Sequence, residues 1–396
     1  MSQSWPEVEL GDVLTLKRGY DLPNSERRDG NVPIVSSSGV SGYHDEAKLN
    51  GPGVVTGRYG TLGEVFLIKE PYWPLNTTLY VQNFKGNDPA FVSYFLRTLN
   101  LASQNAAGAV PGLNRNALHL LKVKVPPLPT QRKIAAVLSA YDDLIENNTR
   151  RVRVLEDMAR ALYREWFVEY RFPGHEQAEF VEDEQGRRPA GWEWVPVPYA
   201  IEIDPRTKVD KNAVNPFVPM GSLAENSMVI SPIEERQGNS GAKFKNGDTL
   251  FARITPCLEN GKTGYVNFLS DDSATAFGST EYIVMRSRLV CPEYVYLLAR
   301  LPEFRDHAEK SMSGASGRQR VKPESLSNYY IAVPHKATLA RFQALVKPMF
   351  DAVFTLSSRN ANLRRTRDLL LPRLVSGELD VSELAVLGLE GGSDEK

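Results

Sequence analysis

The chain has 396 residues, 42% of them hydrophobic and 24% charged, which is enough for two or three soluble domains of ordinary size. It opens without a signal peptide, contains no apolar run near the roughly 20 residues of a membrane span, and has too few cysteines (two) for a disulfide framework or a cysteine zinc site. The net charge of −1 argues against a chain that holds DNA alone, because such affinity comes mainly from Lys and Arg that neutralise phosphates. We therefore expect a cytoplasmic protein with no membrane partner.

Residues 1–128 carry short β-like runs, such as Val54-Val55 and Val65–Ile68. Turns rich in Gly, Asn and Pro separate these runs. The alternation predicts a mixed α+β domain with a curved sheet.

Residues 129–170 are predicted to form one long helix, with Thr130 as its N-cap. Its apolar residues, with Asn148 completing the series, follow one another at alternating spacings of four and three, which is the seam of a coiled coil. The predicted seam contains Ile134, Leu138, Tyr141, Ile145, Val152, Leu155, Ala159, Leu162 and Trp166.

The rest of the chain repeats this order of segments. Residues 171–191 are acidic, contain Pro and Gly, and are predicted to be a linker, while residues 192–335 show the pattern of a second α+β domain. Residues 336–380 are predicted to form a second long helix, which Pro372 is expected to end or kink. The polar tail, residues 381–396, is predicted to be disordered.

An internal repeat relates the two halves, since Val123–Pro126 and Ile331–Pro334 each close a domain and lie 208 residues apart. Adding 208 to the first seam gives a second seam that is apolar at most positions. It contains Phe342, Val346, Met349, Val353, Leu356, Leu363, Leu370 and Leu374. Two matching seams predict that the helices pair within one chain.

Asn148 and Asn360 both fall on the seam, but the offset of 208 does not relate them. As buried residues they would fix the register of the helix pair. As solvated residues they would only mark a polar break in each helix.

No catalytic or metal site is expected from the motifs. Gly261-Lys-Thr263 lacks the upstream glycine of a phosphate-binding loop, because position 256 is Pro256. Asn215-Pro-Phe217 is only faintly similar to the Asn-Pro-Pro-aromatic loop of amino-methyltransferases, and no glycine-rich cofactor motif precedes it. The five histidines lack the spacing of metal ligands.

Five stretches carry a resemblance to a known family. Pro126–Ile134 with Asp142–Asn147, and Leu155–Phe167 after them, resemble the central conserved region of type I restriction–modification specificity (S) subunits. Leu369–Leu379 is similar to the closing motif of that family, and Gly57–Gly63 is similar to its target-recognition domains. Pro334-His335-Lys336 departs from the family pattern at the start of the second helix.

The resemblance implies a fold of α+β class in which two target-recognition domains are separated by a long antiparallel intramolecular coiled coil, with pseudo-twofold symmetry. It implies a non-catalytic subunit that recognises a bipartite site on double-stranded DNA and positions two methyltransferase (M) subunits there. The cofactor S-adenosylmethionine would belong to the methyltransferase partner and not to this chain. Whether restriction (R) subunits join, or whether the chain serves a related phage-defence system, is left open by the sequence.

Equivalent loops of the two halves contain the side chains that we expect to contact DNA, since Arg, Asn, Gln and Ser suit base edges and phosphates. The candidates in the first half are Ser37, Tyr43, Arg58, Tyr59, Asn114 and Arg115. Those in the second half are Arg253, Arg318, Gln319 and Arg320.

Two other classes of function remain as alternatives. A single-chain methyltransferase or nuclease with its own recognition domains would methylate or nick DNA without a partner. A coiled-coil scaffold that binds only protein would leave the two diverged globular halves without a role.

Overall fold

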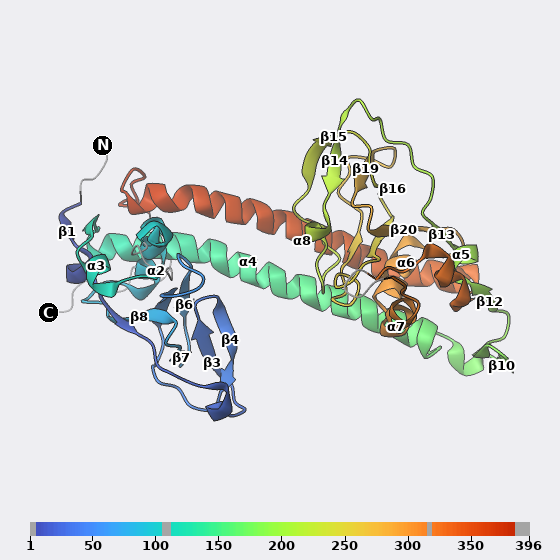
Figure 1. The fold of residues 1–396 in the computed structure, drawn as a ribbon, viewed down its shortest axis with the longest axis horizontal. Helices are drawn as coiled ribbons and strands as arrows, with labels where there is room; N and C mark the ends of the chain where they lie inside the picture. The colour runs from blue at the N-terminus through green and yellow to red at the C-terminus, as the bar shows by residue number, and fades with distance from the viewer. Residues whose placement is uncertain (1–4, 105–111, 315–318, 385–396) are drawn as a thin grey trace. The chain divides into compact units, whose positions relative to one another are not determined.

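The computed structural model describes residues 5–104, 112–314 and 319–384 (Figure 1). The chain divides into two compact units. Unit 1 comprises Met1–Glu146 and Ala361–Lys396, and unit 2 comprises Asn147–Asn360. The predicted disordered tail lies largely outside the described residues. Among these residues, no helix is both long and apolar enough to cross a membrane.

Unit 1 combines three small sheets with short helices and with parts of two long ones. Its strands are β1 (Glu7–Glu9), β2 (Thr15–Arg18), β3 (Val32–Ser36), β4 (Gly39–His44), β5 (Gly53–Gly57), β6 (Val65–Ile68), β7 (Trp73–Pro74), β8 (Thr78–Asn83) and β9 (Lys122–Lys124). Its helices are α1 (Leu10–Val13), α2 (Pro89–Thr98), α3 (Arg115–His119) and parts of α4 (Leu128–Tyr163) and α8 (Lys336–Val375). The sheet orders are β2-β8-β5-β6, β4-β3-β7 and β1-β9.

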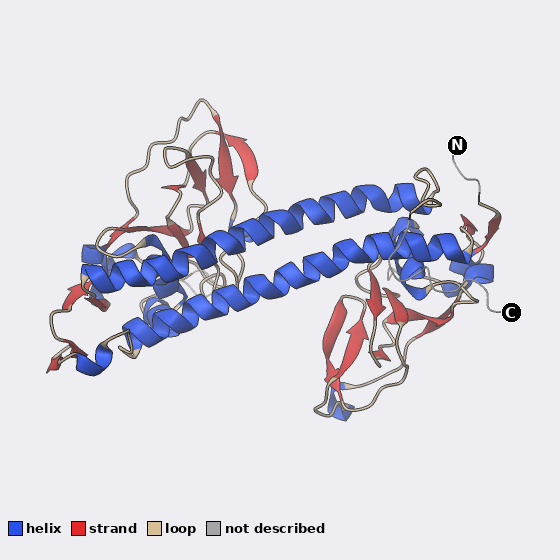
Figure 2. Cartoon of the chain, turned by 180° about the vertical axis from the view of Figure 1, so that it is seen from behind, coloured by secondary structure: helices blue, strands red, loops and turns tan. Residues whose placement is uncertain are grey.

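Unit 2 has a similar set of elements (Figure 2). Its strands are β10 (Phe180–Asp183), β11 (Gly186–Pro189), β12 (Glu193–Pro196), β13 (Ile201–Ile203), β14 (Val214–Val218), β15 (Glu234–Gln237), β16 (Ala242–Lys245), β17 (Thr249–Ala252), β18 (Thr263–Tyr265), β19 (Thr275–Gly278), β20 (Tyr282–Ser287) and β21 (Tyr330–Val333). Its shorter helices are α5 (Val197–Ala200), α6 (Pro292–Arg300) and α7 (Pro302–Lys310).

The internal repeat is visible in the strand order. The sheet β13-β20-β17-β18 of unit 2 has the order of β2-β8-β5-β6 in unit 1, and β12-β21 corresponds to β1-β9. The main-chain hydrogen bond from Leu10 N to Leu121 O (2.8 Å) corresponds to the one from Val197 N to Tyr329 O (2.9 Å). The predicted α+β repeat is therefore confirmed.

In each unit, one helix packs on the four-stranded sheet whose strand order the two units share: α2 on β5 and β6, and α6 on β17, β18 and β20. Helix α2 begins where the Asp88 carboxylate accepts a hydrogen bond from Phe91 N (2.8 Å), with a proline at the first helical position. The apolar face of α2 is buried in the core of unit 1 together with Ile134 and Leu138 of α4. The sheet and the long helix therefore share one core in this unit.

The two long helices run antiparallel within each unit. In unit 1, Arg367 of α8 donates a hydrogen bond to Asp142 of α4. In unit 2, Asn148 Nδ2 donates to Asn360 Oδ1 (2.9 Å), and the Trp166 and Phe342 rings lie 5.7 Å apart. Later positions in α4 thus meet earlier positions in α8, and Asn360 is buried as a seam residue would be.

The ends of the long helices differ from their predicted positions. Helix α4 ends at Tyr163 and continues as a π-helical turn, Arg164–Val168. Helix α8 passes through Pro372 to Val375 and ends before Gly377, whose φ of 77° suits the left-handed position after a helix. The helix continues for three residues after Pro372, so the expectation that Pro372 ends it is wrong.

The predicted linker, residues 171–191, contains a β-hairpin. Strands β10 and β11 pair from Phe180↔Pro189 to Asp183↔Gly186, and Arg188 bonds to Asp183 at 3.0 Å. Local strand pairing therefore orders a segment whose acidic, Gly-containing composition indicated a turn-rich connection.

The helix on the equivalent four-stranded sheet carries a tyrosine in each unit, Tyr94 in α2 and Tyr296 in α6, and the contacts of the two hydroxyls differ. The Tyr94 hydroxyl donates to Asp142 Oδ2 at 2.6 Å, whereas the buried Tyr296 hydroxyl has no hydrogen-bond partner in the part of the chain that the structure describes. The residue 208 positions after Asp142 is Phe350, whose ring lies 5.6 Å from that of Tyr296. An aromatic contact in unit 2 thus replaces a charged one in unit 1.

We expect Tyr94→Phe to lower the free energy of unfolding by about 1.5–3 kcal/mol, because it removes a hydrogen bond to a charged group. Tyr296→Phe should be neutral or stabilising, because it removes a buried hydroxyl without a partner. Urea unfolding of both variants followed by tryptophan fluorescence measures the difference. Equal losses in the two variants would contradict the assigned hydrogen bond.

Candidate nucleic-acid interface

Two predicted loops of unit 1 meet beside strand β5. Arg58 and Tyr59 directly follow β5, and the Arg58 guanidinium lies 4.5 Å from the centre of the Tyr59 ring. Leu113 N donates to Arg58 O at 2.9 Å, and Tyr59 forms a β-bridge with Gly112. The main chain thus joins two segments that lie more than fifty residues apart in the sequence.

The serine loop approaches the same place because glycines face it. A Cβ atom added to Gly60 would lie 3.1 Å from Ser37 Oγ, and one added to Gly57 would lie 3.2 Å from Ser37 Cβ. Ser37 therefore joins Arg58 and Tyr59. Tyr43 is 59% exposed farther along β4, where it pairs with Pro33, and no contact among the described residues brings it to this cluster.

Asn114 and Arg115 begin helix α3. The Asn114 side chain accepts a hydrogen bond from Asn116 N (2.9 Å) and so caps the helix. Arg115 is exposed in the first turn of the helix. The Asn114 amide thus has a structural role that competes with the predicted contact to a base.

Unit 2 repeats this arrangement with other side chains. Val321 N donates to Arg253 O at 2.9 Å, as Leu113 N does to Arg58 O, and Thr255 N donates to Gln319 O at 3.1 Å. Arg253 N donates to Glu281 O (3.0 Å), as Arg58 N does to Thr77 O. The predicted candidates Arg253, Gln319 and Arg320 therefore come together, while Arg318 lies outside the described residues.

Arg320 is held by a carboxylate. Its Nε and Nη2 donate to the two Glu281 oxygens at 2.8 Å each, and this hydrogen bonding lowers the pKa of Glu281 below its ordinary value. A guanidinium in this bidentate pair has fewer donors left for DNA than the sequence alone indicated.

A groove beside strands β14, β15 and β19 of unit 2 was not predicted from the sequence. Its volume is about 520 Å³, and Ser279 and Thr280 of its lining directly precede Glu281. The polar residues of its lining are Arg236, Gln237, Asn239, Ser240, Ser279 and Thr280. The polar run Arg236–Ser240 was the available signal, but it is equally typical of an ordinary turn.

A second cavity continues along the same segment. It has a volume of about 580 Å³, and the basic residues Arg206, Lys208 and Lys243 contribute to its lining. The chain from Arg236 to Lys243 therefore lines first a polar groove and then a basic one. Such an order suits a polymer with polar base edges and negative phosphates.

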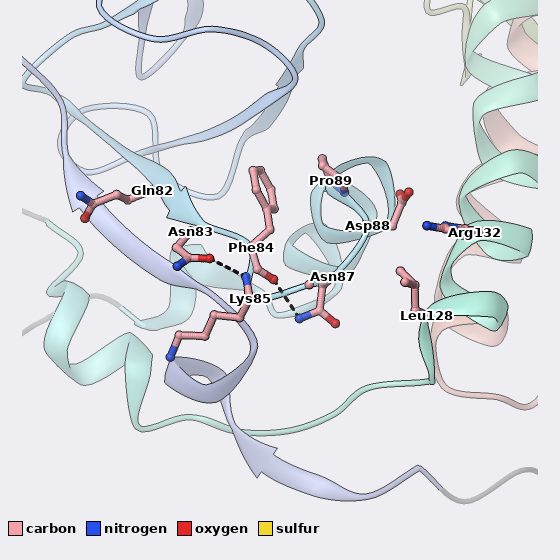
Figure 3. A pocket seen from close by; sticks show the side chains of 10 residues that line it. Gln82, Asn83, Phe84, Lys85, Asn87, Asp88, Pro89, Leu128 and Arg132 are labelled. Atoms are coloured by element: carbon pink, nitrogen blue, oxygen red, sulfur yellow. Dashed lines mark hydrogen bonds between the residues drawn. The ribbon is translucent and has the colours of Figure 1, made fainter.

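A cavity of about 410 Å³ in unit 1 lies where the globular part meets α4 (Figure 3). The loop from Gln82 to Pro89 and the helix residues Leu128 and Arg132 line it. Next to it, buried Gln131 accepts from Asp88 N (3.0 Å) and donates to Asn87 Oδ1 (2.6 Å). The cavity therefore borders the contact between the Asn87–Asp88 segment and the start of α4. Gln131, which makes this contact, belongs to the predicted motif Pro126–Ile134.

Within the described ranges, no group of three or more His, Cys, Asp or Glu side chains could hold a metal ion. The arrangement in each unit instead offers guanidinium, amide and hydroxyl groups on loops. Groups of this kind can bind nucleic acid through hydrogen bonds and charge.

Residues 2–157 match the family model described as the type I restriction modification DNA specificity domain. The type I restriction enzyme MjaIX specificity subunit of Methanocaldococcus jannaschii is 24% identical over 342 residues, which cover 82% of this chain and 76% of that protein. The HindI specificity subunit of Haemophilus influenzae is 24% identical over 70% of this chain and 73% of its own length.

The solved structure of a type I restriction-modification S subunit from M. genitalium has a similar fold. It matches with a TM-score of 0.61 and 12% identity, covering 94% of this chain and 96% of that one. At this identity the likeness concerns the fold alone.

Proposed function

Because the chain belongs to the family of type I restriction–modification specificity subunits, we propose that it recognises a bipartite DNA site, one half through each unit. The observation that carries the proposal is the repeated loop junction. Leu113 N bonds to Arg58 O in one unit, and Val321 N bonds to Arg253 O in the other. The same main-chain arrangement thus occurs in both units and presents a different set of side chains in each.

The differing side chains favour different half-sites. Where unit 1 has Thr77, unit 2 has Glu281, which holds the guanidinium of Arg320. Base edges are distinguished by the placement of donors and acceptors, so two such surfaces would select different bases.

We further propose that this chain performs no chemistry and positions methyltransferase subunits, to which S-adenosylmethionine binds, on the DNA. Its net charge of −1 supports a need for phosphate contacts from partner chains. The proposed domain limits are residues 1–128 and 192–335 for the recognition domains and 129–170 and 336–380 for the helices.

Methylation of a host genome tests the proposal. The chain is expressed with the methyltransferase encoded beside it in a host without DNA methylation, and long-read sequencing maps the methylated bases. We expect a split motif that disappears when this chain is omitted. Exchanging residues 1–128 for the matching segment of a relative should change one half of the motif and leave the other intact.

Two outcomes would contradict this role. Methylation that persists without the chain would mean that the partner reads its own site, which would favour the protein-only scaffold. Methylation or nicking by the purified chain alone would favour a single-chain enzyme.

A further inference from the structure

Arg236 of strand β15 is held in a defined plane at the edge of the 520 Å³ groove. Its guanidinium lies 3.8 Å from the centre of the Phe217 ring, and Phe217 packs against Phe277 with ring centres 5.0 Å apart. Glu234 accepts from Arg236 Nε at 2.9 Å and lies 2.7 Å from Nη2. The arginine is thus fixed on two sides, while half of its side chain stays exposed.

We propose that Arg236 determines specificity in unit 2 by contacting a guanine in the second half of the DNA site. This step rests on the proposed function. A guanidinium can donate two parallel hydrogen bonds to O6 and N7 of guanine, which is the commonest specific contact between a side chain and a base.

The free edge of the guanidinium suits such a contact. Glu234 occupies Nε and one side of Nη2, and Nη1 has no hydrogen-bond partner among the residues that the structure describes. The outer protons of Nη1 and Nη2 therefore remain for two acceptors. Since stacking and the ion pair already restrict the side chain, binding costs less rotational freedom than for a mobile arginine.

Glu234 also favours a base over a phosphate as the target. Its carboxylate lies beside the guanidinium and would repel a phosphate diester, whereas a base edge carries no net charge. The neighbouring cavity is lined by three basic residues, Arg206, Lys208 and Lys243, against one carboxylate, Asp204, and this excess of positive charge is better suited to phosphates. The segment from Arg236 to Lys243 would thus contact a base at one end and the backbone at the other.

Unit 1 also has a cation that lies over an aromatic ring and beside a carboxylate, but this cation is a lysine and has no planar guanidinium. Lys48 lies 4.4 Å from the centre of the Trp73 ring and pairs with Glu46 at 2.7 Å. An ammonium is a point charge and cannot make the bidentate contact that a guanidinium makes. The Lys48–Trp73 stack therefore cannot make the two parallel hydrogen bonds proposed for Arg236.

The test compares Arg236→Lys and Arg236→Ala with the unaltered chain, each expressed with the methyltransferase and read by long-read methylation sequencing. We expect methylation at sites with another base at one position of the second half to rise roughly 10- to 100-fold relative to sites with guanine there. The first half of the motif should not change. Arg236→Lys keeps the charge, so its relaxed motif would separate bidentate recognition from simple attraction.

Arg187→Lys is the matched control, because Arg187 also stacks on an aromatic ring (4.2 Å from the centre of Phe180) but lies on the β10–β11 hairpin. Its motif should stay unchanged. An unchanged motif in both Arg236 variants would overturn the assignment while leaving the proposed function intact. A uniform loss of methylation with no relaxed position would also overturn it, and would indicate a phosphate contact. Absence of any chain-dependent motif would overturn the proposed function itself.

Discussion

Replacing Phe342 by alanine is expected to lower the free energy of unfolding of the chain by about 3–5 kcal/mol. Phe342 is fully buried at the start of α8, and its ring centre lies 4.6 Å from that of Phe167 and 5.7 Å from that of Trp166. The variant would leave a cavity among aromatic side chains that cannot collapse without moving α4, and the lost burial and the cavity add to the cost.

Leu345→Ala is the matched control, since Leu345 lies nearly one turn farther along α8 and is 48% exposed. Its cost should stay within about 0.5 kcal/mol, as for most exposed substitutions. Urea unfolding followed by tryptophan fluorescence compares the two variants. Similar losses for both would show that Phe342 does not join the two helices of unit 2 in the way described.

Asp248→Ala is expected to destabilise unit 2 by about 3–5 kcal/mol, because it leaves the Arg286 guanidinium without its partner in a mostly buried place. The Asp248 side chain is 1% exposed and accepts from Arg286 Nε and Nη2 at 2.7 Å each. It also accepts from Lys245 N at 2.8 Å, so that one carboxylate holds the turn before β17 and the end of β20.

A surface pair supplies the comparison for this prediction. Lys347 and Asp351 lie 3.0 Å apart on α8 with side chains 57% and 64% exposed, so Asp351→Ala should cost at most about 1 kcal/mol. At 1 M salt that cost should vanish while the cost of Asp248→Ala persists, because buried charges are screened far less. A cost for Asp248→Ala that disappears with salt would refute a buried ion pair.

The repeat and the two long helices could be predicted from the sequence because their signals are local. Spacings of four and three depend only on the helical repeat, and every seam residue from Ile134 to Trp166 follows them. The loops of Arg58 and Arg253 could also be matched, since each directly follows a strand at an equivalent place in the two halves.

The hydrogen bond between Asn148 and Asn360 could not be predicted from the internal repeat. An offset of 208 compares positions that are equivalent in the two halves, whereas antiparallel helices bring together positions whose numbers change in opposite directions. Direction is decided by the path of the whole chain between α4 and α8, which no local pattern contains.

The roles of individual polar side chains were decided only in three dimensions. Arg320 is bound by Glu281, Asn114 caps a helix, and Arg236 stacks on Phe217 in a groove that separate strands build. The sequence by itself determined the repeated α+β plan and the two long helices, because apolar periodicity acts over a few residues. Only the tertiary structure decided which donors remain available for a partner, because hydrogen bonds and burial depend on neighbours that lie far away along the chain.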